Sequence, residues 1–157
     1  MTIQLLAAFR VTRSRIGLAV FANEKVEFAR CLNLPFTSHQ AAINSLRNLL
    51  GWVLEQFSEP VLAVERTRGS PDINALADEI SRLAQEHNLP LVSVQSSDLF
   101  GAYSVPVLKS RDQLRTAAGT IWPGLVLLKR KEILDAAALG LYVQTHHLLG
   151  SPISPNN

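Results

Sequence analysis

The pattern of apolar and polar positions begins with three strand-like segments. Apolar runs cover residues 3–9 and 16–21, and a looser alternation of apolar and polar residues covers 26–34. Short polar segments connect the three runs, and consecutive strands with short connections most simply form hairpins. We therefore expect the chain to open with an antiparallel meander of three strands.

After the third predicted strand, the spacing of apolar residues changes from two residues to about 3.6 residues. Thr37 to Gln40 fits a capping box, and the amphipathic pattern that follows predicts a helix running to about Ser58. The next apolar run, 61–64, has no polar interruption, which is typical of a strand covered on both faces. We expect this run to be a central strand of the sheet.

A second helix is predicted to start at Ser70 as N-cap with Pro71 in its first turn, and to stop near residues 87–88. Residues 89–94 form another short apolar run. A strand that follows a helix in this way lies parallel to the preceding strand through a right-handed crossover.

The periodic pattern of apolar and polar residues weakens after Ser96. A capping box at 110–113 starts a further helix that Pro123-Gly124 is expected to end, and a last helix is predicted from near Lys131 to about Leu149. The order of elements is thus three strands, helix, strand, helix, strand and terminal helices.

Composition sets the class of protein. The chain has 157 residues, 47% of them hydrophobic, which suits one α/β domain over 1–149 followed by a flexible tail at 150–157. No apolar run approaches the roughly 18 residues of a membrane span. The single cysteine, Cys31, excludes an internal disulfide, and Met1 is followed directly by an apolar strand rather than a signal peptide, so we expect a cytoplasmic location.

Candidate chemistry lies at the end of the central strand, where Glu65 is followed by Arg66 and Arg68. In open α/β sheets the functional crevice lies outside the carboxyl ends of the strands. Glu132 and Asp135 are three residues apart at the start of the last helix, so both are expected on one helical face.

The order of elements resembles the ribonuclease H-like fold. Three segments are similar to the RuvC and YqgF branch of that superfamily, which includes Holliday junction resolvases: residues 15–20 in the second strand, 63–65 in the fourth, and 132–139 in the last helix. The resemblance implies a five-stranded mixed sheet in the order 3-2-1-4-5, with Arg10 beside Glu65. It also implies nucleic acid as partner, DNA rather than RNA, and a homodimer.

An active member of this branch is a metal-dependent endonuclease. In this chain Glu65, Glu132 and Asp135 would be its catalytic carboxylates, with Glu65 and Asp135 the ligands of Mg²⁺. The chain departs from the pattern at Arg10, which stands where the family carries an Asp at the end of strand one. A guanidinium in place of a carboxylate changes the local charge by two units and puts a permanent cation where the metal belongs.

We consider three functions for a chain that departs from the family pattern in this way. The first is a catalytically impaired, nuclease-derived module that binds phosphates; the candidate contacts are Arg10, Arg13, Arg15, Arg66, Arg68 and Lys131. The second is an active Mg²⁺-dependent endonuclease that uses the remaining carboxylates. The third is a structural or partner-binding domain without a nucleic-acid role, in which Arg10 only neutralises Glu65 and Asp135.

The arginine at position 10 leads to two predictions, one geometric and one chemical. Its guanidinium is expected within hydrogen-bonding reach of Glu65 or Asp135. Arg10→Asp, which restores the ligand set that the resemblance implies, is expected to recover binding of Mg²⁺ or Mn²⁺.

Overall fold

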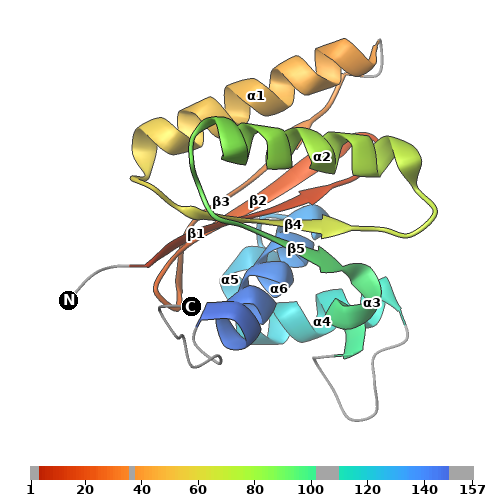
Figure 1. Ribbon diagram of the computed structural model, residues 1–157. Coiled ribbons are helices and arrows are strands. Elements are labelled where there is room, and N and C mark those ends of the chain that lie inside the picture. The colour runs from red at the N-terminus through yellow and green to blue at the C-terminus, as the bar shows by residue number, and fades with distance from the viewer. Residues whose placement is uncertain (1–3, 36–37, 102–109, 149–157) are drawn as a thin grey trace.

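A five-stranded mixed sheet separates two layers of helices (Figure 1). The computed structural model describes residues 4–35, 38–101 and 110–148. The strands lie in the order β3-β2-β1-β4-β5, which confirms the predicted order. Their bounds are Leu5–Val11 for β1, Arg15–Ala22 for β2, Lys25–Asn33 for β3, Val61–Arg66 for β4 and Leu91–Gln95 for β5.

Strand register brings the candidate residues together. β1 pairs antiparallel with β2 and β2 antiparallel with β3, as the short connections predict. β1 also pairs in parallel with β4, and Phe9 lies opposite Val64. The next residues along the two strands are Arg10 and Glu65, so both reach the same edge of the sheet.

Two helices cover one face of the sheet, α1 (His39–Gln56) and α2 (Pro71–Glu86) (Figure 1). The predicted capping box is displaced by one residue: the Ser38 side chain accepts a hydrogen bond from the Ala41 amide at 3.0 Å, while Thr37 lies outside the described residues. A serine hydroxyl one residue later satisfies the same unpaired amides at the start of the helix.

On the other side of the sheet, the described part of the chain forms four helices and a π-helical segment (Figure 1). They are α3 (Ser96–Gly101), α4 (Arg111–Ile121), α5 (Pro123–Val126), α6 (Lys131–Val143) and the π-helix Gln144–Leu148. The predicted start at Lys131 is confirmed. Helix α3 was not expected, because six residues are too short to display a helical period in sequence.

Pro123 ends α4, as expected, and also begins α5. Proline is favoured in the first turn of a helix because its missing amide hydrogen is not needed there. The predicted end of the last helix, Leu149, and the predicted tail lie outside the described residues. No helix in the part of the chain that the structure describes is long and apolar enough to cross a membrane.

Gly17 on β2 allows α6 to lie close against the sheet. A Cβ atom added at Gly17 would overlap the backbone carbonyl oxygen of Glu132, in the first turn of α6. Real side chains do not approach a backbone this closely, so only glycine fits here. Gly17 thereby sets the distance at which Glu132 and Asp135 meet the strands.

Candidate functional site

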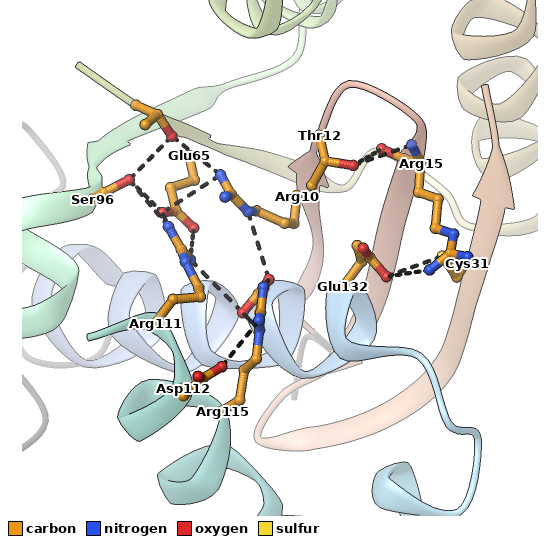
Figure 2. A network of polar contacts seen from close by, with 12 residues as sticks. Arg10, Thr12, Arg15, Cys31, Glu65, Ser96, Arg111, Asp112, Arg115 and Glu132 are labelled. Carbon is orange, nitrogen blue, oxygen red and sulfur yellow. Dashed lines mark hydrogen bonds and ion pairs between the residues drawn. The ribbon is translucent and has the colours of Figure 1, made fainter. Parts of the chain in front are cut away.

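Two buried carboxylates meet three arginines at the edge where β1 and β4 end (Figure 2). Glu65 comes from β4 and Asp135 from α6, and both are fully buried. Arg10 comes from β1, and Arg111 and Arg115 come from α4. We call these five residues the arginine–carboxylate cluster.

Glu65 is held mainly by Arg111. The Arg111 guanidinium donates from Nη1 to Glu65 Oε1 at 3.0 Å and from Nη2 to Oε2, a two-point contact that matches a planar carboxylate. The hydroxyl of Ser96 donates to Glu65 Oε2 at 2.5 Å. Both carboxylate oxygens of Glu65 are therefore engaged by donors from the protein itself.

Asp135 is held in the same way by Arg115. Arg115 Nε donates to Asp135 Oδ1 at 3.0 Å and Nη2 donates to Oδ2 at 2.9 Å. Arg111 Nη1 lies 3.7 Å from Oδ1, so Arg111 links the two carboxylates. Helix α4 thus supplies the two strongest counter-ions of the cluster.

Arg10 lies between both carboxylates at ion-pair distance. Its Nη1 is 3.7 Å from Glu65 Oε2 and its Nε is 3.6 Å from Asp135 Oδ2. These distances exceed those of a hydrogen bond, so the expected direct hydrogen bond to a carboxylate is not formed. Arg10 Nη1 instead donates to Thr67 Oγ1 at 3.2 Å, while its buried Nε has no hydrogen-bond partner in the described structure.

The pKa values follow from burial and from these contacts. Burial alone raises the pKa of Glu65, but the hydrogen bonds from Arg111 and the charge of Arg10 outweigh it, so the pKa lies below its ordinary value. Burial raises the pKa of Asp135, and hydrogen bonds from Arg115 oppose the rise only in part. Burial also lowers the pKa of Arg10, since a charged guanidinium is costly to desolvate.

Glu132 does not join the cluster, which corrects the expectation that three carboxylates converge. Its Oε1 lies 3.8 Å from Arg15 Nη1 and accepts a weak hydrogen bond from the Cys31 thiol at 3.8 Å. Residues three apart on a helix differ in direction by about 60°. Here that angle directs Glu132 toward Arg15 and Cys31 on β2 and β3 (Figure 2). Asp135 instead lies within ion-pair distance of Arg10 on β1.

These residues do not fit the Mg²⁺ that the resemblance implies. Mg²⁺ needs carboxylate oxygens free to coordinate it in an octahedral arrangement. All four carboxylate oxygens of Glu65 and Asp135 instead accept hydrogen bonds from arginine. Across residues 4–35, 38–101 and 110–148, no group of three or more His, Cys, Asp or Glu side chains is arranged to hold a metal ion.

The remaining candidate cations differ in accessibility. Arg13, Arg68 and Lys131 are exposed, and the Arg15 side chain is 37% exposed beside Glu132. Arg66 instead donates to Asp78 of α2 at 2.5 Å. Successive side chains of a strand point to opposite faces, so Arg66 is directed to the α1–α2 face while Glu65 is directed to the α6 face.

Sequence reasoning missed Arg111, Arg115, Ser96 and Thr67. A signal for the arginines was present: Ser110 caps α4, and Arg111 and Arg115 are four residues apart, hence on one face of that helix. The role of Ser96 had no such signal, because it depends on β5 ending beside β4.

Comparisons with known proteins identify the fold. No protein-family model and no curated protein sequence matches the chain. Solved structures do match. RuvC from T. thermophilus in complex with a Holliday junction substrate has a TM-score of 0.73 at 15% identity, covering 94% of this chain and 96% of that one.

Two further solved structures are similar. A second T. thermophilus RuvC structure has a TM-score of 0.72 at 15% identity over 94% of this chain and 98% of its own. The fowlpox virus Holliday junction resolvase has a TM-score of 0.56 at 15% identity over 90% and 97%. The chain therefore has the ribonuclease H-like fold of RuvC-type resolvases.

Proposed function

We propose that this protein is a nuclease-fold module that binds nucleic acid through its phosphates and does not cleave it by the metal-dependent route of its structural neighbours. One observation carries the proposal: Glu65 and Asp135, the carboxylates of the arginine–carboxylate cluster, are fully buried and hydrogen-bonded by arginines of α4. A guanidinium supplies positive charge to a phosphate but stays protonated, so it neither generates hydroxide nor acts as a base.

The proposed nucleic-acid contacts are the accessible cations near the cluster. Arg13, Arg15, Arg68 and Lys131 lie at or next to the ends of β1 and β4 or at the start of α6, and Arg10 acts from within the cluster. Contacts to phosphates position a nucleic acid without reading its sequence. We propose DNA rather than RNA as the partner, supported by the structural neighbour that was solved in complex with a Holliday junction substrate.

Binding and cleavage assays on labelled four-way junctions, duplexes and single strands test this function. We expect saturable binding that weakens steeply as salt is raised, because bound cations on DNA are released, and intact DNA in the presence of Mg²⁺ or Mn²⁺. Metal-dependent cleavage by the unmodified protein, abolished in Glu65→Gln, would instead establish an active endonuclease. Absence of binding at low salt would favour a structural or partner-binding domain.

A further inference from the structure

We propose that the pocket beside the arginine–carboxylate cluster binds a phosphomonoester, either the terminal phosphate of a nucleic-acid strand or that of a free mononucleotide. The pocket lies outside the ends of β4 and β5 and has a volume of about 740 Å³. The side chains that matter for the argument are Thr67, Arg68, Ser96, Ser97 and Phe100. The strand-end form of this inference rests on the proposed function.

Two hydroxyl groups connect the pocket wall to the buried arginines. Thr67 Oγ1 accepts a hydrogen bond from Arg10 Nη1 at 3.2 Å and lies 3.3 Å from Ser96 Oγ. Ser96 Oγ in turn accepts from Arg111 Nη2 at 3.4 Å. The Ser96 hydrogen goes to Glu65 Oε2, so Thr67 is the donor in its contact with Ser96. An anion in the pocket can take that one Thr67 hydrogen in place of Ser96.

The position of Thr67 is set by the protein before any ligand arrives. Asn74 of α2 accepts a hydrogen bond from the Thr67 amide at 3.1 Å and donates one to the Thr67 carbonyl at 2.9 Å. A donor held in place in this way loses little conformational freedom on binding. The pocket wall is therefore preorganised around Thr67.

The charges around the pocket favour a dianion. The cluster has three guanidinium groups and two carboxylates, so one positive charge is left over when all are ionised. Arg68 is exposed at the pocket and adds a second. The acidic residues in the first turns of α2 and α3, Asp72 and Asp98, do not line this pocket.

The charge of its phosphate distinguishes the phosphorylated end of a nucleic-acid strand from the interior of that strand. A phosphomonoester carries about −1.5 to −2 charges at pH 7, whereas an internal phosphodiester carries one. The Arg10 Nε atom, buried without a hydrogen-bond partner, shows that the cluster has more donors than its carboxylates satisfy. The volume leaves room for a sugar and base next to Phe100, whose ring lies 5.0 Å from the Arg111 guanidinium carbon.

Matched oligonucleotides test the inference. One pair of single strands differs only in a 5′-phosphate or 5′-hydroxyl and a second pair only in a 3′-phosphate or 3′-hydroxyl, each labelled at the other end. We expect the phosphorylated member of at least one pair to bind on the order of tenfold more tightly. Arg68→Ala and Thr67→Val are expected to reduce that ratio to about twofold or less.

Arg13→Ala is the matched control, because Arg13 is exposed and lines a separate pocket between α1 and α2. It should weaken binding of both members of each pair equally and leave the ratio unchanged. Equal affinities for phosphorylated and hydroxyl ends overturn the strand-end inference while leaving the proposed function intact. A ratio that persists in both pocket variants places the phosphate elsewhere and also overturns it.

Titration with a mononucleotide 5′-phosphate and with the matching nucleoside separates the two sources. Binding of the mononucleotide that requires Arg68, without binding of any oligonucleotide, supports the pocket and contradicts the proposed function. No binding of either the mononucleotide or the phosphorylated strands contradicts the pocket.

Discussion

At the scale of single residues, the site is defined by how each charge is paired. Arg111 makes a two-point hydrogen-bonded contact with Glu65, whereas Arg10 approaches the same carboxylate only to 3.7 Å. Removing one member of a buried, hydrogen-bonded charge pair leaves the other uncompensated. The two arginines are therefore not equivalent for stability.

We predict that Arg111→Ala lowers the free energy of unfolding by about 3–5 kcal/mol, and that Arg10→Ala lowers it by about 1–3 kcal/mol. The smaller loss for Arg10 is expected because Arg111 and Arg115 still neutralise both carboxylates. Urea unfolding measures both values, and Arg13→Ala, at an exposed position, serves as the control with little change. A larger loss for Arg10→Ala than for Arg111→Ala would contradict this ranking.

The lowered pKa of Glu65 predicts a pH-dependent stability. Folding favours the ionised carboxylate, so this contribution is present above the ordinary pKa of 4.5 and is lost as the pH falls through the lower value in the folded protein. We expect Glu65→Gln to destabilise the protein at pH 7 and the difference from the parent to narrow below pH 4.5. Urea unfolding of both proteins across this range measures the difference, which should not widen with acid.

At the scale of elements, helix α4 decides how Glu65 and Asp135 are paired. Its arginines hydrogen-bond both Glu65 and Asp135 by contacts that do not involve Arg10. The sequence-based expectation that Arg10→Asp alone recovers metal binding therefore has to be revised. Arginines from two elements block the metal site that the resemblance implies: Arg10 on β1, and Arg111 and Arg115 on α4.

We predict that Arg10→Asp alone does not gain metal-dependent stabilisation, and that the triple variant Arg10→Asp, Arg111→Gln, Arg115→Gln does. The triple variant leaves three carboxylates without arginine partners, and a cation that binds only the folded state raises its stability. Thermal unfolding with and without Mn²⁺ measures the effect. Stabilisation of the single variant by Mn²⁺ would contradict this prediction, because it would show that the metal displaces Arg111 and Arg115 from the carboxylates.

Close packing of α6 on β2 predicts opposite effects for two glycine substitutions. Gly17→Ala forces the start of α6 away from the sheet and should cost about 1–3 kcal/mol in the free energy of unfolding. Gly51→Ala, in the middle of α1 with open space around it, should raise the free energy of unfolding by about 0.5–1 kcal/mol. Chemical unfolding of both variants provides the comparison.

At the scale of the whole molecule, the parallel pairing of β1 and β4 gathers residues from distant parts of the chain at one edge. Arg10, Glu65, Arg111 and Asp135 span most of the sequence and meet within one cluster. The exposed arginines near the same edge make it the surface where a phosphate backbone is proposed to bind. The homodimer implied by the resemblance remains a prediction that sedimentation equilibrium tests.

Salt dependence separates arginines that contact phosphates from those already paired. We predict that Arg68→Ala lowers the slope of log affinity against log salt by about one unit for duplex DNA. Arg66→Ala should change the slope less, because Arg66 is ion-paired with Asp78. Titrations of both variants against the same DNA decide the ranking, and a larger effect for Arg66 would place the interface on the α2 side.

The sequence by itself determined the order of the five strands and the longer helices, and its resemblance to the ribonuclease H-like fold implied the order of the strands in the sheet. Period-two and helical apolar patterns are local, and few topologies accommodate three hairpin-connected strands followed by a crossover. Arg10 and Glu65 were recognised because each ends a predicted strand, and the resemblance implies that these two strands lie side by side. Helix starts at Pro71 and Arg111 were likewise readable from proline and a capping residue, and the start near Lys131 from the helical spacing of the apolar residues that follow.

Only the tertiary structure decided how the charges pair. Glu132 and Asp135 looked equivalent in sequence, yet the packing of α6 on Gly17 turns one toward Arg15 and the other toward Arg115. Arg111 and Arg115 reach the buried carboxylates because α4 packs against α6, a contact between segments that no local pattern encodes. Local periodicity specifies elements, whereas the partners of a buried charge depend on side chains that meet only after the elements have packed.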